Sequence, residues 1–212
     1  MKKIILLLVS VFLITGCTNI NELSYDQIIV NGINNSSHKQ NVKRKGYGYV
    51  LSHGLKISNQ EEFNDIIESE RNVYYLYVDL VSYFNKVEFN YERVSNIFYS
   101  QAYENNGKKG YLEINEIKND KYLIEIMYNY AKIEVIVDEA DLKLALSDAI
   151  SILSSITYND NIISNLMKQD VLNFSEEEFN IFETTSTENN VLELFESEET
   201  EQEDVPDTDL VN

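Results

Sequence analysis

The chain has 212 residues, which suits one folded domain with extensions. Asp and Glu number 36 against 17 Lys and Arg, and no basic cluster of the kind that follows a phosphate backbone is visible, so nucleic-acid binding is disfavoured. The single cysteine excludes an internal disulfide, so stability has to come from a core, for which 43% hydrophobic residues are enough. Most of the net charge of −19 belongs to the end of the chain, because 15 acids and no Lys or Arg follow Lys168.

The first 17 residues have the organisation of a secretory leader. Lys2 and Lys3 form a positive start, and Ile4–Ile14 is an apolar run interrupted only by Ser10. A membrane-spanning helix needs roughly 20 residues, so this shorter run fits the apolar region of a signal peptide rather than a permanent anchor.

Ile14-Thr15-Gly16-Cys17 closes the leader and resembles the lipobox of bacterial lipoproteins: an aliphatic residue, two small residues and an obligatory cysteine. The resemblance implies that signal peptidase II cuts between Gly16 and Cys17 and removes a signal peptide of residues 1–16. Cys17, acylated by a diacylglyceryl group and palmitate, would then anchor the protein to the extracytoplasmic face of the cell membrane. An ordinary signal peptide with a chance cysteine is the alternative.

Residues 17–45 are predicted to form a lipidated spacer. Ser24 and Gln27 stand at capping-box spacing and predict a helix over 24–32. The polar and basic segment Asn35–Lys45 is typical of a solvated linker, and the alternative is contact with anionic lipid heads beside the tether.

A globular domain over 46–182 is expected next. It begins with two short strands and the turn between them: Gly46–Leu51, Ser52-His53-Gly54 and Leu55–Ile57. A second capping-box pattern at Ser58-Asn59-Gln60-Glu61 predicts a helix that buries Phe63, Ile66 and Ile67. Asn72–Val81 is apolar at both alternating sets of positions, which predicts a central strand covered on both sides. Tyr83–Phe89 is expected to continue as a strand or as the arm of a turn.

Antiparallel strands dominate the next part of the chain. A strand at Asn96–Tyr103 and a turn at Asn105-Asn106-Gly107 are followed by a predicted meander whose strands and turns are Gly110–Ile117, Asn119-Asp120, Lys121–Tyr128, Asn129-Tyr130 and Lys132–Val137. In its last strand, Ile133, Val135 and Val137 alternate with Lys132 and Glu134.

The end of the domain is predicted to be helical. Asp138 is placed to cap a helix whose apolar stripe is wide enough to cover a sheet face: Leu142, Leu146, Ala149, Ile150, Leu153 and Ile156. Asp160–Lys168 predicts a short helix with Ile162, Ile163 and Leu166 inward. Val171–Phe182 is expected to add a last strand or an extended strap, and 183–212 is predicted to be a disordered acidic tail.

These elements predict an α+β fold with a mainly antiparallel sheet covered by helices. Their order resembles the PsbP-like α/β/α sandwich, through residues that match its opening strand and turn and the end of its late helix: Gly46, Tyr49, His53, Gly54, Leu55, Ser155 and Ile156. The chain departs from that pattern because no Pro precedes Gly54 and no Trp follows it. The resemblance implies a non-catalytic accessory or docking module. The whole chain also resembles uncharacterised lipoproteins of low-GC Gram-positive bacteria.

Motifs for catalysis, cofactors and metals are absent from the sequence, so none of these sites is predicted. The only imidazoles are His38 and His53, and there is no Gly-x-Ser-x-Gly, His-Glu-x-x-His, cysteine pair or Gly-rich loop between a strand and a helix. Asp79, Glu113 and Glu125 lie on predicted strands, where they are polar sheet positions or, alternatively, acid–base groups.

The aspartates of the tail and two pairs of tyrosines also have both a structural and a functional interpretation. Asp204, Asp207 and Asp209 indicate a solvated tail rather than a Ca²⁺ loop, because the Gly and terminal Glu of such a loop are missing. Tyr47/Tyr49 and Tyr128/Tyr130 are expected to pack in the sheet, unless they form exposed rows that could stack on glycans.

The sequence therefore predicts a surface lipoprotein that is a monomer and docks an envelope protein or a small ligand without catalysis. Its contact with the membrane would run through the diacylglyceryl group on Cys17. The alternatives are an envelope-metabolism enzyme that uses carboxylates and a small-ligand-binding lipoprotein. A deep pocket lined by converging carboxylates would favour the enzyme, and an exposed aromatic patch rimmed by polar groups would favour docking.

Overall fold

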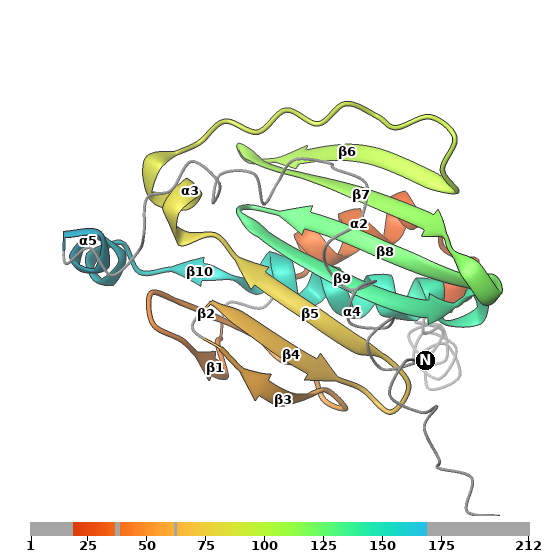
Figure 1. Cartoon of the computed structure of the whole chain (residues 1–212), viewed down its shortest axis with the longest axis horizontal. Coiled ribbons are helices and arrows are strands. Elements are labelled where there is room, and N and C mark those ends of the chain that lie inside the picture. Colours follow the sequence, from red (N-terminus) through yellow and green to blue (C-terminus); the bar gives the residue numbers. More distant parts are fainter. Residues whose placement is uncertain (1–18, 37–38, 62, 169–212) are drawn as a thin grey trace, which may run out of the picture.

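The computed structural model describes residues 19–36, 39–61 and 63–168 (Figure 1). Gly16 and Cys17, His38, the 169–182 segment and the acidic tail lie outside these residues. The fold is α+β, as the sequence predicts, with a seven-stranded antiparallel sheet, a three-stranded sheet and a few helices. Among the helices of the described residues, none is long and apolar enough to cross a membrane.

The large sheet consists of two meanders that meet in its middle. Its order is β3-β4-β5-β9-β8-β7-β6, and the β5–β9 pair joins the two meanders. The strands are β3 (Lys56–Gln60), β4 (Asn64–Glu68), β5 (Val73–Val78), β6 (Tyr99–Asn105), β7 (Lys108–Glu116), β8 (Lys121–Tyr128) and β9 (Ala131–Asp138). The small sheet pairs β2 (Tyr47–Tyr49) with β1 (Val42–Lys43) and β10 (Thr157–Tyr158).

Two helices cover one face of the large sheet. α4 (Leu142–Ser155) packs on β8 and β9, and α2 (Tyr25–Asn34) packs on α4, so that both lie behind the sheet in Figure 1. The hydrophobic core lies between the large sheet and these helices, with Ile124, Ile133 and Val135 from the sheet and Leu146 from α4. The shorter helices are η1 (Ile20–Glu22), α3 (Leu80–Asn85), η2 (Lys118–Asp120), η3 (Glu139–Asp141) and α5 (Asp160–Lys168).

The predicted meander of β7, β8 and β9 is confirmed, together with its turns. Asn106 and Gly107 both have positive φ, as do Asn129 and Tyr130, which is the conformation that a two-residue hairpin turn requires. Asn119 and Asp120 also have positive φ between β7 and β8. Turn chemistry in the sequence therefore located these strand connections correctly.

The helix predicted to bury Phe63, Ile66 and Ile67 is wrong, because this segment is strand β4. Asp65 and Ile67 are buried while their neighbours are half-buried, which is the alternation of a strand. β4 pairs with β3 on one side and with β5 on the other. The backbone N–H and C=O groups of β4 therefore form their hydrogen bonds with these two strands rather than within a helix. The proposed capping residues Ser58 to Gln60 themselves belong to β3.

The predictions for the next segment also need correction. The strand ends at Val78, because the Asp79 carboxylate accepts a hydrogen bond from the Ser82 backbone N–H at 2.8 Å and caps helix α3. β5 is buried on one face only, since Val73 on the other face is 36% exposed, and β9 occupies the middle of the sheet instead. Tyr83 lies in α3 and Phe89 in an irregular loop, so neither continues the strand.

Helix α2 confirms the capping box at Ser24 and Gln27, with both reciprocal hydrogen bonds formed. This helix was expected in a spacer, but Ile28 and Ile29 lie in the core and the Ser154 hydroxyl donates to the Gly32 carbonyl at 3.1 Å. The first part of the predicted spacer is thus packed against the domain.

The C-terminal helices match the predicted pattern with two corrections. All six predicted stripe residues of α4 are buried, but Asp138 pairs with Lys121 at 2.8 Å instead of capping the helix, which begins after Asp141. In α5, Ile163 and Leu166 point inward as predicted, whereas Ile162 is exposed.

Candidate functional site

Three glutamates form one row on the face of the large sheet opposite α2 and α4, which we call the second face. Glu113 on β7 pairs directly with Glu125 on β8, and Glu125 pairs with Glu134 on β9. Residues opposite each other on adjacent strands place their side chains on the same face about 5 Å apart, so the register brings these carboxyl groups together. We call these three residues the glutamate row.

A single lysine bridges two members of the glutamate row. Lys132 Nζ lies 2.7 Å from Glu134 Oε1 and 3.6 Å from Glu125 Oε2. The Tyr111 hydroxyl donates a hydrogen bond to Glu125. Lys132, Glu125 and Glu134 are all buried, so their charges interact with each other more strongly than they would in water.

Burial shifts the protonation of the row toward the neutral acid. It raises the pKa of Glu134 above its ordinary value, with the Glu125 carboxyl reinforcing this rise and the Lys132 ammonium opposing it. Burial likewise raises the pKa of Glu113, although the hydrogen bond from Tyr91 opposes the rise. Such a shift is typical of acid–base groups in active sites, but it also arises in structural networks of buried charges.

An irregular loop over residues 86–98 covers part of the second face. The Tyr91 ring stacks on the Tyr111 ring with 4.8 Å between their centroids, and the Phe89 ring lies 5.5 Å from the Tyr111 ring. The Tyr91 hydroxyl donates to Glu113 Oε1 at 2.8 Å, and the Val94 backbone N–H donates to Ser100 Oγ at 3.0 Å. The loop therefore closes the Glu113 end of the row.

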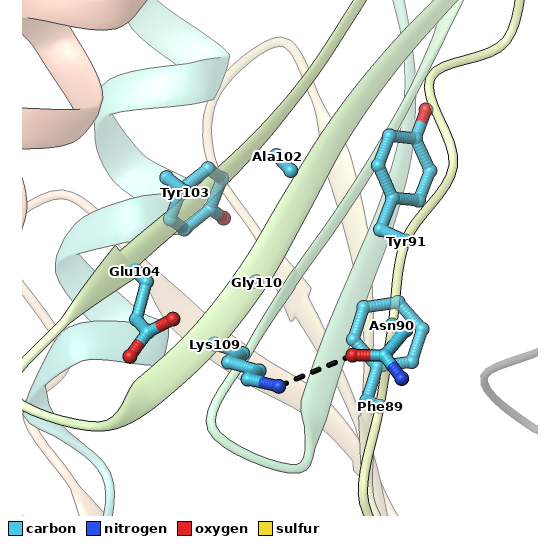
Figure 2. Close-up of a pocket in the computed structure, with 8 residues that line it drawn as sticks. All are labelled: Phe89, Asn90, Tyr91, Ala102, Tyr103, Glu104, Lys109 and Gly110. Carbon is cyan, nitrogen blue, oxygen red and sulfur yellow. Dashed lines mark hydrogen bonds between the residues drawn. The ribbon is translucent and has the colours of Figure 1, made fainter.

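An open hollow of about 310 Å³ lies between this loop and the β6–β7 hairpin. Figure 2 shows the aromatic side chains of Phe89 and Tyr91 on one side, facing β6 and β7 across the hollow. Polar side chains rim it, with Asn90 Oδ1 accepting a hydrogen bond from Lys109 Nζ at 3.2 Å and Glu104 on the opposite side. We call this feature the aromatic hollow.

The structure separates the three predicted carboxylates. Glu113 and Glu125 come together in the glutamate row, whereas Asp79 serves as a helix cap elsewhere. Sequence reasoning missed Glu134 and Lys132 as their partners. The alternation in Lys132–Val137 predicted that Lys132 and Glu134 share the face opposite the apolar residues. The predicted turn at Asn129-Tyr130 fixes the register of the two strands that it joins, and this register places Glu134 opposite Glu125.

The other candidate residues form no site. His53 is exposed in its turn. Tyr47, Tyr49 and Tyr128 are buried, so the tyrosine rows pack in the sheets rather than forming exposed platforms. Within the described part of the chain, no group of histidine, cysteine, aspartate and glutamate side chains is arranged to hold a metal ion.

No family model matches the chain, and no curated protein matches it. A GTP-binding regulator from Thermotoga maritima is a solved structure with 11% sequence identity, covering 62% of this chain and 88% of its own, at a TM-score of 0.24. A similarity of that size supports no conclusion about fold or function. The structure itself defines an α+β domain with a buried charge network and an open aromatic hollow beside it.

Proposed function

We propose that this protein is a lipid-anchored lipoprotein of the bacterial cell envelope and that its folded domain docks a partner without catalysing a reaction. The docking role is supported by the difference between the glutamate row and the aromatic hollow. The glutamates are buried and already bonded to Lys132, Tyr111 and Tyr91, whereas the aromatic hollow is open. Aromatic side chains within a polar rim are the usual anchors of a protein interface.

The membrane anchor in this proposal rests on the sequence of the leader. The short apolar run and the Ile14–Cys17 motif together support acylation of Cys17. Because each buried CH₂ of an acyl chain contributes about 0.8 kcal/mol, two or more chains hold a protein firmly where one would exchange. Such a tether would keep the domain at the extracytoplasmic surface of the cell membrane.

The lipid anchor is tested by metabolic labelling with a palmitate analogue. Wild-type protein should incorporate the label and fractionate with membranes, and Cys17→Ala should lose the label and be released or left unprocessed. Ser10→Ala, which changes the leader without touching the motif, is the control and should label normally. Equal labelling of Cys17→Ala and the wild type would refute the anchor.

The docking role is tested by covalent cross-linking on intact cells followed by capture of the full-length protein. Phe89→Ser changes the aromatic side of the hollow and Lys109→Glu changes its polar rim, and each variant should lose a partner that the wild type captures. Lys118→Glu makes the same charge reversal at an exposed site beyond the other end of β7 and should keep that partner. Identical capture by all four proteins would remove the hollow from the docking role.

An enzyme that uses the glutamate row is the second candidate, supported by the raised pKa of Glu134. Glu125→Gln distinguishes the two functions, because it removes a carboxylate that does not line the aromatic hollow. Docking predicts that Glu125→Gln still captures the partner in the cross-linking experiment. An enzyme predicts that Glu125→Gln abolishes turnover of any substrate found in a screen of envelope glycans and peptides.

A further inference from the structure

β6 forms one edge of the large sheet, and among the described residues β7 is the strand that pairs with it (Figure 1). The pairing keeps one continuous register over all seven residues of β6. The opposite edge, β3, has a register shift between Ile57 and Asn59, and such a bulge hinders the addition of a further strand. The described strand β6 carries no bulge, proline or lysine, which are common protections of a sheet edge.

The turn of the β6–β7 hairpin determines which backbone groups of β6 point outward. This turn has two residues, so Asn105 and Lys108 are a hydrogen-bonded pair and every second residue before Asn105 also bonds to β7. Ala102 and Glu104 lie between these residues, so their N–H and C=O groups point away from β7. The Lys109 carbonyl accepts a hydrogen bond from the turn after β8 at 3.0 Å, which agrees with this alternation.

The two outward-facing residues, Ala102 and Glu104, are exposed, and both line the aromatic hollow. Within the described part of the chain, no backbone hydrogen bond joins either residue to a segment other than β7. The exposed Gln101 side chain donates to the Ala102 carbonyl at 3.2 Å, and a partner's backbone N–H could replace this local bond. At Ser100 a backbone N–H of the 86–98 loop donates to the hydroxyl at 3.0 Å, so the open stretch is the hairpin half of β6.

We propose that the partner docked at the aromatic hollow is an extended polypeptide segment that joins the sheet as a strand beside β6. This inference rests on the docking role proposed above and names the chemical class of the partner. A row of backbone N–H and C=O groups, repeated at every second residue, is complementary to another extended backbone. The added strand forms hydrogen bonds with Ala102 and Glu104, and its side chain opposite Ala102 lies on the second face beside the hollow.

The neighbours of the added strand determine which side chains it should carry. Ala102 is small, so a large apolar side chain opposite it can extend over it toward Phe89 and Tyr91, which Figure 2 shows across the hollow. Glu104 on the same face favours a Lys or Arg opposite it, two residues from the apolar one. A second copy of β6 is a poorer occupant, because it brings Ser100, Ala102 and Glu104 to this face and no large apolar side chain.

The test selects twelve-residue peptides from a random phage-displayed library on residues 17–212 with Cys17→Ala, and follows amide hydrogen exchange by NMR. In the free protein, the amides of Ala102 and Glu104 should exchange quickly and that of Tyr103 slowly. A selected peptide should slow exchange at Ala102 and Glu104 at least about tenfold. Methylation of the peptide's backbone nitrogens should weaken binding about tenfold at every second position only, because alternate N–H groups face β6.

Two charge reversals test the side-chain preference. On the Glu104→Lys protein, selection should yield peptides with Asp or Glu in place of the Lys or Arg. Glu116→Lys is the matched control, because Glu116 is an exposed residue at the other end of β7, and it should leave the selected sequences unchanged. Identical sequences selected on the Glu104→Lys protein and on the wild type would contradict the proposed pairing.

The outcomes separate this inference from the docking role. Peptide binding that is lost in Phe89→Ser but leaves exchange at Ala102 and Glu104 unchanged would overturn strand addition and keep the docking role. Selection of no peptide, while capture on cells still depends on the hollow, would lead to the same conclusion. If capture does not depend on the hollow and no peptide binds, both fail.

The free protein provides a last check. Slow exchange of the Ala102 and Glu104 amides without peptide would also overturn the proposal. If this protection does not change with protein concentration, a strand of the same chain occupies the edge. If it increases with protein concentration, a second copy occupies the edge.

Discussion

Arg44 Nη2 lies 2.9 Å from Asp65 Oδ1, and this buried ion pair joins the small sheet to the large one. Arg44 follows β1, and Asp65 lies on β4. The Tyr49 hydroxyl of β2 donates to the other carboxylate oxygen of Asp65 at 2.7 Å. Arg44 belongs to the basic segment before Gly46, which was expected to be a solvated linker. One charged side chain of that segment is therefore buried in the fold.

Removing the charge of Arg44 should destabilise the domain strongly. We expect Arg44→Met to lower the free energy of unfolding by about 3–5 kcal/mol, because Asp65 would remain buried without its cation. Urea denaturation followed by circular dichroism measures this change. The control is Arg71→Met, which breaks an ion pair with Asp141 whose arginine is mostly exposed and should cost less than about 1 kcal/mol. Equal costs for the two substitutions would contradict the placement of Arg44.

Lys132 on the second face should contribute as much to the stability of the domain as Arg44 does. Lys132→Met leaves Glu125 and Glu134 facing each other in a buried site without a cation, so we expect a loss of about 3–5 kcal/mol near neutral pH. Lys121→Met is the matched control on the neighbouring strand, because its ion pair with Asp138 is exposed and should contribute less than about 1 kcal/mol. A Lys132→Met protein as stable as this control would show that the network is not buried.

The glutamate row should make the domain more stable in mild acid than at neutral pH. Burial raises the pKa of Glu134 and of Glu113 above 4.5, so the folded state holds these protons more tightly than the unfolded chain does. The stability gained in this way is fully present below pH 4.5 and is lost as the pH rises through the folded-state pKa.

Glu134→Gln tests this dependence directly. It leaves one carboxylate, Glu125, for Lys132, so it should stabilise the domain at neutral pH and reduce the change in stability between about pH 5 and about pH 7. Denaturation curves of both proteins at the two pH values provide the measurement. An unchanged pH dependence would mean that Glu134 does not titrate in this range.

The α4 stripe should not tolerate a charge. Leu146 is fully buried between α4 and the sheet, so Leu146→Asp would bury an unpaired carboxylate and should prevent cooperative folding. Leu144→Asp is the control two residues away, because Leu144 is 46% exposed and the substitution should leave the thermal transition nearly unchanged. A cooperative transition in Leu146→Asp would argue against the packing of α4.

Gly32→Ala should destabilise the protein although it improves intrinsic helix propensity. A Cβ atom at Gly32 would lie 2.5 Å from Ile150 Cγ2, on a stiff β-branched side chain of α4. The overpacking should cost about 1–3 kcal/mol, which exceeds the gain of about 1 kcal/mol in propensity. Val30→Ala on the exposed side of α2 should change stability by less than about 0.5 kcal/mol. Stabilisation by Gly32→Ala would mean that α2 does not pack on α4.

Local physical chemistry was enough to predict much of this protein from its sequence. The capping box at Ser24, the Asn-Gly turn at 106–107 and the stripe of α4 each depend on residues within a few positions of one another, and each was confirmed. The antiparallel meander followed from such turns, and the α+β class followed from the meander and the helices.

Tertiary structure decided the features whose partners are distant in the sequence. Residues 64–68 form a strand because β3 and β5 pair with them, which outweighs a local signal for a helix. The glutamate row exists because the register of β7, β8 and β9 aligns Glu113, Glu125 and Glu134, and because Lys132 is buried beside them. A periodic pattern shows which residues share a face of one strand. Only the pairing of strands and the segments that cover them determine which side chains meet there and whether water reaches them.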